Sequence, residues 1–510
     1  MTKTYNNYED LITFTRASKG HALRPVSYGD ELVTNGTFDT DTSSWTAFAA
    51  DLSVSGGELV VTNNATAFGR GYQGVTTEVG KLYQFSCDVN YTGDAGRIRL
   101  GTTSAGNEIY EQQSIAEDKT VVVNFVATTT TTYIRLGLQA NTNGHSIQFD
   151  NASLKEVLFD QPDGTLTLFE HPNNVPRVEY DADGNRLGLL VEESRTNLIT
   201  HSEDLTQTTW DKGSQTTVTL STTTAPNGVS GCSRVQFTGS SRGSNRVHSI
   251  LLPSPLNSST HTVSAWVKST SGADQKFALK CTHGGVVDYF SADFTATSEW
   301  QRFDFSQAFG TGGTSAIVGI VGGSAGNAAD LEVWGFQFEG NASFPTSYIK
   351  TTGSTATRSA DVASIPVADF GYNQSAGTVT VEFALDNTTS NKRLFSLNDG
   401  GTTERIDGLI NSANSAVLFV VDGNSNVVNQ SVSGYVDGEY SKVAASYELD
   451  NYRLTMDGAT PVSDSSATVP TITTLTIGTG PAFAPINGHI KSIKYYPRRL
   501  TNAQLQEITS

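Results

Sequence analysis

Residues 173–210 read NNVPRVEYDADGNRLGLLVEESRTNLITHSEDLTQTTW, and the rest of the chain divides around this stretch. It joins one Thr-, Gly- and Ser-rich region before it to two more after it, and it is denser in charge than its neighbours. Residues 180–185 predict a tight hairpin turn, because an Asp-Gly pair supplies the positive φ that such a turn requires. The apolar run at residues 188–191 follows, with Glu192 and Glu193 directly after it. The stretch is therefore a connector between β regions.

Two other interpretations of this connector are weaker. A spacing of polar residues that starts at Asp181 and ends at Glu192 suits an EF-hand loop, but Arg186 stands where that loop must have Gly, and no amphipathic helix flanks it. A hairpin turn is favoured over a calcium loop. Glu192 and Glu193 have the composition of a catalytic pair, yet adjacent residues of an extended chain point to opposite faces. We therefore expect them to be solvated or to contact another subunit.

Composition and charge narrow the class of protein. A chain of 510 residues is too long for one core and predicts about three domains. With 48 Gly, 2 Met and 16% charged residues, it favours strands and turns over helices. The net charge of 33 − 51 = −18 disfavours nucleic-acid binding, which needs a basic surface. The sequence has neither the apolar segment of a secretory signal at its start nor a run of about eighteen apolar residues, so no membrane insertion is expected.

Local patterns predict where strands and the last helix lie. Residues 82–89, 133–138 and 378–385 alternate apolar and polar side chains, as half-buried strands do. Thr501 and Gln504 have the spacing of a helix-capping box after the final strand. A short C-terminal helix is therefore predicted.

Residues 197–350 repeat the strand plan of residues 29–157, which indicates a duplicated fold. Three scattered cysteines are too few for a disulfide framework or a zinc site, so we expect small apolar core residues. The tryptophans at equivalent places in the two copies are also expected in the cores. These predicted core residues are Cys87, Cys232, Cys281, Trp45 and Trp210.

Two short enzyme motifs occur in a context that does not support them. Residues 322–326 fit the formula of the serine-hydrolase elbow, but a strand rather than a helix is predicted after them. Residues 69–74 fit the dinucleotide-binding formula, but the β-branched residues 75–80 provide no helix N-terminus for a pyrophosphate. Both motifs are predicted to be loops or strands. No catalytic residue is predicted.

The connector resembles one found in tailed-phage virion proteins, chiefly tail fibres, spikes and head appendages. The residues that carry this resemblance are Val175-Pro176-Arg177, Tyr180-Asp181, Gly184, Leu187-Gly188-Leu189-Leu190, Glu192-Glu193 and Arg195-Thr196-Asn197-Leu198. Residues 13–18 resemble the arm of that family, and residues 344–349 with Arg358 resemble its closing segment. The resemblance implies a virion structural protein that is assembled in the host cytoplasm and contacts other virion proteins. It also implies a homo-oligomer, usually a trimer, and the mixed charges of the connector suit pairing between its subunits.

Three regions resemble carbohydrate-binding or lectin folds. Residues 29–157 look like the jelly roll of a carbohydrate-binding module, which residues 197–350 repeat, and residues 375–510 resemble a laminin-G/concanavalin-like sandwich. The predicted fold is all-β: two jelly-roll β-sandwiches followed by a concanavalin/laminin-G-like β-sandwich with a short C-terminal helix. The predicted division is an arm at 1–28, the first jelly roll at 29–157, a connector at 158–196, the second jelly roll at 197–350, a linker at 351–374 and the last sandwich at 375–510.

Carbohydrate-binding jelly rolls commonly hold a structural calcium ion, and the resemblance implies that Asp39 and Asp150 are ligands in the first copy. Carboxylate oxygens suit calcium. The second copy has Trp334 where Asp150 would lie, so calcium is expected only in the first. No other cofactor is expected.

The function implied by these resemblances is non-covalent attachment to a host cell-surface polysaccharide. Aromatic rings stack on sugars, but most aromatics of a sandwich lie in its core, so no glycan site is assigned. The aromatic candidates are Tyr83, Tyr91, Tyr110, Tyr133 and Trp266. Two alternatives stay open: a glycan depolymerase with these modules as accessories, and a purely structural capsid decoration protein. The first is disfavoured because no segment is left over for a catalytic domain.

Overall fold

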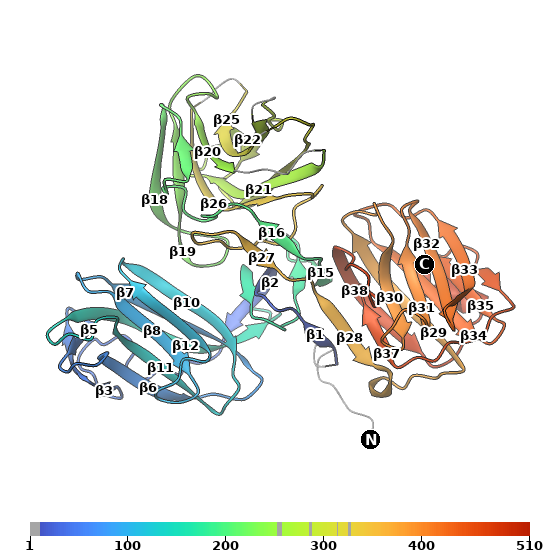
Figure 1. The fold of residues 1–510 in the computed structure, drawn as a ribbon, viewed down its shortest axis with the longest axis horizontal. Helices are drawn as coiled ribbons and strands as arrows, with labels where there is room; N and C mark the ends of the chain where they lie inside the picture. The colour runs from blue at the N-terminus through green and yellow to red at the C-terminus, as the bar shows by residue number, and fades with distance from the viewer. Residues whose placement is uncertain (1–10, 252–257, 285–287, 314, 325–327) are drawn as a thin grey trace. The chain divides into compact units, whose positions relative to one another are not determined.

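The computed structural model describes residues 11–251, 258–284, 288–313, 315–324 and 328–510. These residues form strands throughout, and the part of the chain that is described contains one α-helix (Figure 1). The chain divides into two compact units, Arg24–Thr167 on the one hand and Met1–Leu23 with Leu168–Ser510 on the other. The predicted all-β fold is confirmed. Residues 1–10 of the predicted arm lie outside the described residues.

The first jelly roll is built from two antiparallel sheets. Its strands are β2 (Gly20–Tyr28), β3 (Thr46–Phe48), β4 (Ala50–Ser55), β5 (Glu58–Asn63), β6 (Arg70–Thr76), β7 (Leu82–Asn90), β8 (Gly96–Gly101), β9 (Tyr110–Ile115), β10 (Lys119–Val126), β11 (Thr131–Leu138), β12 (Ser146–Phe159) and β13 (Thr165–His171). One sheet has the order β10-β7-β12-β2-β13, with β5 on β12 and β4 on β5; the other has the order β3-β6-β11-β8-β9.

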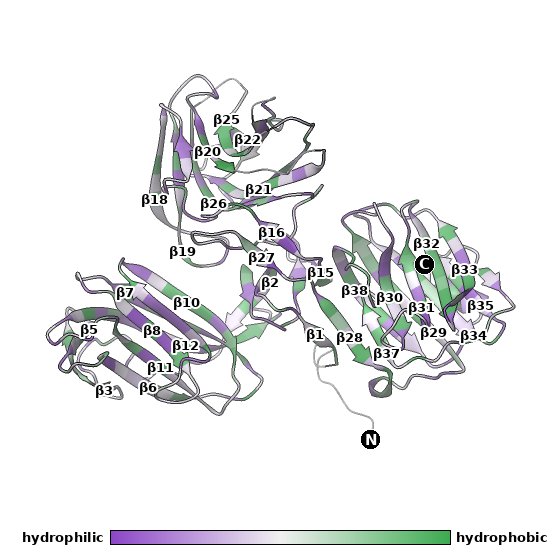
Figure 2. Ribbon diagram, viewed as in Figure 1, coloured by the Kyte–Doolittle hydropathy of each residue, from purple (hydrophilic) through white to green (hydrophobic). Residues whose placement is uncertain are grey.

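The five-stranded sheet of this jelly roll has one apolar and one polar face. Ile98 and Leu100 of β8 and Ile134 and Leu136 of β11 are fully buried in the core between the sheets. Because side chains alternate along a strand, the residues between them lie on the outer face. Figure 2 shows strands of this sandwich changing between hydrophobic and hydrophilic segments along their length. This outer face is available for binding.

The second jelly roll repeats this plan. Its strands are β16 (Arg195–Asn197), β17 (Trp210–Lys212), β18 (Thr216–Thr224), β19 (Ser230–Phe237), β20 (Arg246–Leu251), β21 (Thr260–Ser269), β22 (Gln275–Gly284), β23 (Phe294–Ala296), β24 (Gln301–Ala308), β25 (Ser315–Gly322), β26 (Ala329–Glu339) and β27 (Ala356–Arg358). The sheet order β17-β20-β25-β22-β23 corresponds strand by strand to β3-β6-β11-β8-β9, the five-stranded sheet of the first jelly roll. The other sheet has the order β18-β19-β26-β16-β27, with β21 on β26 and β24 on β21.

Equivalent positions of the two copies confirm the duplication. Asp150 of β12 lies opposite Asp88 of β7, and Trp334 of β26 lies opposite Trp266 of β21. The ladder is irregular next to both pairs. The predicted core residues are buried: Cys87, Cys232, Cys281, Trp45 and Trp210.

The C-terminal sandwich has two seven-stranded sheets. Its elements are β1 (Thr13–Thr15), β14 (Val178–Tyr180), β15 (Arg186–Val191), β28 (Val362–Pro366), β29 (Ala376–Leu385), β30 (Lys392–Asn398), β31 (Arg405–Ile410), β32 (Ser415–Asp422), β33 (Ser425–Ser433), β34 (Ser441–Glu448), β35 (Tyr452–Met456), β36 (Val462–Asp464), β37 (Thr474–Ile477), β38 (Gly488–Tyr496) and α1 (Asn502–Thr509). The orders are β1-β28-β37-β30-β31-β32-β33 and β14-β15-β38-β29-β34-β35-β36. The arm and the connector therefore supply edge strands to this sandwich.

Local predictions about turns and the helix are confirmed. β14 pairs with β15 across a turn in which Gly184 has a φ of 81° and Asp181 accepts the Asn185 amide at 2.8 Å. The capping box of α1 is present in both directions between Thr501 and Gln504. Among the described residues, no helix is long and apolar enough to cross a membrane.

Neither enzyme motif has the context its chemistry needs. The dinucleotide-like motif lies on β6, which is a strand. The elbow-like motif follows β25 and precedes β26, so a strand and not a helix comes after it. The Ser324 hydroxyl donates to Asp293 at 2.7 Å. Residues 325 and 326 of that motif lie outside the described residues.

Five charged side chains from distant parts of the sequence meet in a buried network: Arg16, Arg177, Glu192, Arg358 and Asp361. Arg177 lies at its centre, because its guanidinium contacts Glu192 at 2.8 Å and also donates to Asp361. Arg16 lies 3.4 Å from Asp361, and Arg358 lies 3.5 Å from Glu192. No side chain of the network is more than 3% exposed. The network ties the arm, the connector and the predicted linker together.

Two backbone amides and the Ser347 hydroxyl also donate hydrogen bonds to the carboxylates of this network. Ser347 donates its amide and its hydroxyl to Glu192 at 2.7 and 2.6 Å, and the Glu192 amide donates to Asp361 at 2.9 Å. Burial acts to raise the pKa of Glu192, but Arg358, Arg177 and the bonds from Ser347 outweigh it and hold that pKa at about 2.

The structure corrects the interpretation of the connector charges. The solvated or intersubunit role predicted for Glu192 is wrong, because this carboxylate is buried within the chain. Glu193 pairs with Arg195 of the same chain, and its side chain is 26% exposed. Both acids thus find their partners without a second subunit.

Candidate functional site

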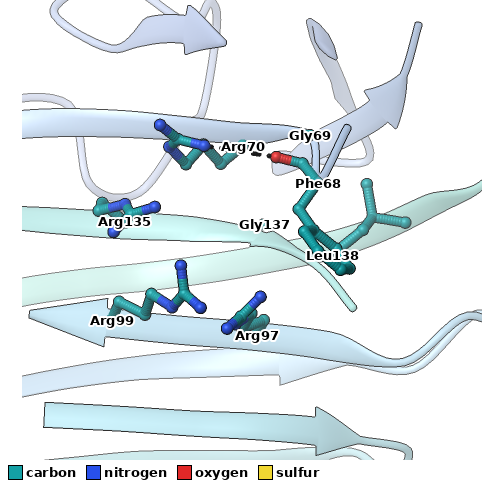
Figure 3. A pocket seen from close by; sticks show the side chains of 8 residues that line it. All are labelled: Phe68, Gly69, Arg70, Arg97, Arg99, Arg135, Gly137 and Leu138. Carbon is teal, nitrogen blue, oxygen red and sulfur yellow. Dashed lines mark hydrogen bonds between the residues drawn. The ribbon is translucent and has the colours of Figure 1, made fainter. Parts of the chain in front are cut away.

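Four arginine side chains gather on the outer face of the five-stranded sheet in the first jelly roll. Arg70 comes from β6, Arg97 and Arg99 from β8, and Arg135 from β11, which lies between those two strands. Arg135 is directly opposite Arg99, and Gly137 is directly opposite both Arg70 and Arg97. Figure 3 shows the four side chains next to one another. The register of the strands, rather than proximity in sequence, brings them together.

A small hollow lies among these arginines. Its volume is about 20 Å³, and Phe68, Gly69 and Leu138 complete its wall. Gly137 forms part of its floor, where a side chain is not tolerated: a Cβ there would lie 2.5 Å from the carbonyl oxygen of Gly69. The hollow is large enough for one water-sized group. It fits a single polar group of a ligand and not a whole sugar ring.

The arginines have few partners for their many donors. Glu111 accepts hydrogen bonds from both Arg97 and Arg99 with the same oxygen, Oε1. Arg135 donates through Nη1 to the carbonyls of Ala105 and Gly106, at 2.7 and 2.8 Å. Each guanidinium carries five N–H groups, so most of the donors of this cluster are not used by these contacts.

Burial and mutual repulsion act on the cations of this site. Burial lowers the pKa of Arg135 to about 10, and the neighbouring charges of Arg70 and Arg99 add to this effect. Burial also lowers the pKa of Arg70, again with a contribution from Arg99. A negatively charged group that accepts hydrogen bonds here would relieve this repulsion.

Exposed aromatic rings border the arginines. Phe48 and Phe68 are 47% and 41% exposed. The guanidinium carbon of Arg70 lies 3.9 Å from the centroid of the Phe48 ring, and that of Arg97 lies 5.1 Å from the Phe68 centroid. Each ring and its arginine thus form a flat, partly apolar platform beside the hollow. Hydrogen-bond donors next to exposed aromatic rings suit a ligand that has both hydrogen-bond acceptors and an apolar face.

The C-terminal sandwich offers a second, weaker candidate. Arg393 and Arg405 both donate to Oδ2 of Asp407, at 2.9 and 3.0 Å. The Phe483 ring covers Arg393, with 3.1 Å between the ring centroid and the guanidinium carbon. Beside them lies a cavity of about 410 Å³ whose lining includes Phe483 and Asn398. Because two arginines share one carboxylate here, less positive charge is left for a ligand than in the cluster of four arginines.

The predicted calcium ligands lie close enough to interact. Burial raises the pKa of Asp150, and the charges of Asp88 and Asp39 raise it further. The side-chain amide of Asn151 donates to both Asp88 and Asp150, at 2.8 and 3.1 Å. In the described part of the chain, no group of three or more acidic, His or Cys side chains is arranged to hold a metal ion. Calcium at Asp39 and Asp150 stays a prediction.

The aromatic residues singled out from the sequence do not form one site. Tyr83 is buried in the core, whereas Tyr91 is 41% exposed. The arginine cluster was missed, although one signal was present: Arg97 and Arg99 alternate with apolar residues in a chain with few charges. Only the strand register shows that Arg70 and Arg135 join them.

Comparison with known protein families supports the fold assignment of the C-terminal sandwich. The family described as Concanavalin A-like lectin/glucanases superfamily, a laminin G family, matches residues 357–506. This confirms the expected type of the C-terminal sandwich. No curated protein matches the chain.

Solved structures similar to this chain include carbohydrate-binding modules and laminin G domains. One is the CBM40 of the Ruminococcus gnavus IT-sialidase bound to alpha2,3 sialyllactose, with 13% identity, 27% of this chain and 84% of that chain covered, and a TM-score of 0.25. Another is the CBM22-1-CBM22-2 tandem domain of Paenibacillus barcinonensis Xyn10C, with 13% identity, coverage of 61% and 98%, and a TM-score of 0.24. A third is LG4-5 of the mouse laminin alpha1 chain, with 13% identity, coverage of 51% and 90%, and a TM-score of 0.22. These similarities concern the fold alone.

Proposed function

We propose that this protein binds glycan, without cleaving it, through the outer face of the first jelly roll. The observation that carries the proposal is the cluster of Arg70, Arg97, Arg99 and Arg135 around a hollow that aromatic rings border. Sugars present hydroxyl oxygens that accept hydrogen bonds and apolar C–H faces that pack on rings, so both features of the site have a partner in a saccharide. The rest of a polymer would extend across the sheet, since the hollow itself takes only one group.

The biological setting that we propose is a tailed-phage virion. In it the protein is a subunit of a tail fibre, spike or head appendage that attaches to a host cell-surface polysaccharide and contacts other virion proteins. The ordered resemblance of the arm, the connector and the closing segment supports this setting. A homotrimer is proposed on the same resemblance alone, because the connector acids are paired within one chain. Light scattering tests the trimer: a mass near 54.4 kDa at micromolar concentration, which is that of one chain, would contradict it.

A glycan array probed with the full chain tests the proposed function. We expect binding to a restricted set of glycans and a marked loss of binding when Phe48 is replaced by Ala. Phe48→Tyr, which keeps the aromatic ring, should retain binding and serves as the matched control. Absence of binding to every glycan would favour the alternative of a structural decoration protein. Release of reducing sugar from a bound polysaccharide would instead favour the depolymerase.

A further inference from the structure

The arginine cluster carries more positive charge than its own chain neutralises. Four guanidinium groups lie around the hollow, and Glu111 and Glu108 are the carboxylates whose charges act on Arg135. Glu111 is engaged by Arg97 and Arg99. This local excess of positive charge occurs in a chain with a net charge of −18. The chain as a whole therefore repels polyanions, so binding of one requires a local excess of positive charge such as this cluster.

Two donors of the cluster are left over. Among the described residues, neither Nε of Arg70 nor Nε of Arg135 has a hydrogen-bond partner, although both atoms are buried from solvent. Arg135 is only 4% exposed and lines the hollow. A buried donor without an acceptor costs about 1–3 kcal/mol, and more when it is charged. Both arginine side chains line the hollow, so a ligand there lies beside arginines whose donors are not fully satisfied by the described residues.

In the second jelly roll, the side chains at the corresponding positions of this sheet carry less positive charge. There His248 of β20 and Lys280 of β22 flank Gly319 of β25, as Arg70 and Arg97 flank Gly137 in the first copy. Asp211 lies 3.2 Å from His248, and Asp288 lies 2.9 Å from Lys280. Burial lowers the pKa of His248 to about 4, so at neutral pH Lys280 is the cation of this pair, and Asp288 balances it. In the first copy, by contrast, Arg97 and Arg99 share Glu111, and Arg70 and Arg135 add two more cations around the hollow.

We infer that the ligand of the first jelly roll is an acidic polysaccharide, and that an ionised group of it, a carboxylate or a sulfate, places one oxygen in the hollow between Arg70, Arg99 and Arg135. This inference rests on the proposed function, because it specifies which glycan the site takes. Carboxylates and sulfates present several oxygens to the planar fork of a guanidinium, which matches unused arginine donors on neighbouring strands. A volume of about 20 Å³ suits an oxygen of such a group. Phe48 and Phe68, which are exposed beside the hollow, offer apolar surface to the sugar ring that carries the group.

Isothermal titration of the full chain with three polymers of equal length tests the inference. The polymers are a polyuronate, a dextran sulfate and a neutral dextran. We expect tight binding of at least one acidic polymer and much weaker binding of neutral dextran. The better of the two acidic polymers identifies the ionised group as a carboxylate or a sulfate.

The decisive variant is Arg70→Gln, because the Arg70 side chain makes one contact to the chain backbone, to Phe68 at 3.5 Å, and its loss leaves the sheet intact. Its matched control is Arg246→Gln, the same charge change on the corresponding sheet of the second copy, where Arg246 pairs with Asp211. Loss of a charged donor weakens binding about tenfold or more, so Arg70→Gln should lose at least this much and Arg246→Gln little. Arg99→Lys, which keeps the charge but not the fork, should also weaken binding.

The outcomes distinguish failure of this inference from failure of the glycan-binding function. Equal losses in Arg70→Gln and Arg246→Gln would overturn the inference, because they would mean diffuse electrostatic binding. Neutral dextran bound as tightly as the acidic polymers would also overturn it, while the glycan-binding function stands. Failure of every polymer in the titration and of every glycan in the array would overturn both.

Discussion

Replacement of Glu192 by Gln removes one of the two carboxylates in the buried network and leaves three arginines around the other. Two independent routes give the size of the effect. The pKa of Glu192 lies at about 2 against an ordinary 4.5, and at about 1.4 kcal/mol per pH unit this difference corresponds to about 3 kcal/mol. Breaking a buried ion pair by removing one partner costs about 3–5 kcal/mol. We therefore expect the network to open about 3 kcal/mol more easily in Glu192→Gln.

Amide hydrogen exchange at neutral pH, followed by mass spectrometry, measures the free energy of opening this network locally. A local measurement is needed because a chain of several domains does not unfold in one step. The reporting amides are those of Ser347, which donates to the Glu192 side chain, and of Asp361, which donates to the Glu192 carbonyl. A change of about 3 kcal/mol makes their exchange about a hundredfold faster.

The neighbouring residue provides the control. Glu193→Gln makes the same chemical change one position along the chain, but Glu193 is partly exposed and pairs with Arg195 outside the buried network. Partly exposed pairs contribute about 0–1 kcal/mol, so exchange at Ser347 and Asp361 should hardly change. Equal exchange in both variants would refute the view that the buried network stabilises this junction.

Three further predictions follow from other parts of the chain. Because the folded pKa of Glu192 lies below its ordinary value, its stabilisation is fully present above about pH 4.5 and is lost as the pH falls towards 2. The free energy of opening the junction, taken from exchange rates corrected for their intrinsic pH dependence, should therefore fall over that range in the native chain and change less in Glu192→Gln. Thr501→Ala should destabilise α1 by about 1 kcal/mol through loss of its N-cap, seen as faster exchange in that helix alone. Calcium should raise the melting temperature of the full chain, and Asp39→Ala or Asp150→Ala should abolish the rise; an unchanged melting curve when EDTA is added to metal-loaded protein would contradict calcium binding.

The sequence predicts the fold well where the signal is local. Alternation of apolar and polar residues locates β7, β11 and β29. The capping box at Thr501 and the Asp-Gly turn are equally local, and both are confirmed. The family resemblance indicates the sandwich types, because it spans whole domains.

Two features depend on long-range register and are not visible in the sequence. Arg16 and Asp361 are 345 positions apart, and only the folded chain brings them into contact. The sequence therefore suggested solvent or another subunit as the partner of the connector acids Glu192 and Glu193, because charged residues are rarely buried unless they are paired. Likewise Arg70 and Arg135 lie on different strands, and a change of one residue in the register of either would place its side chain in the core. The residues of the resemblance are now explained in part, since Arg16, Arg177, Glu192, Ser347 and Arg358 are members or partners of one network.

The central claim is that the outer face of the first jelly roll binds a glycan. Hydrogen exchange of the full chain, with and without a saturating concentration of a polysaccharide that it binds, tests this claim most directly. The account predicts slower exchange in β6, β8 and β11, the strands that carry Arg70, Arg97, Arg99 and Arg135, and unchanged exchange in β20, β22 and β25 of the second copy. Protection confined to the second jelly roll or to the C-terminal sandwich would contradict it.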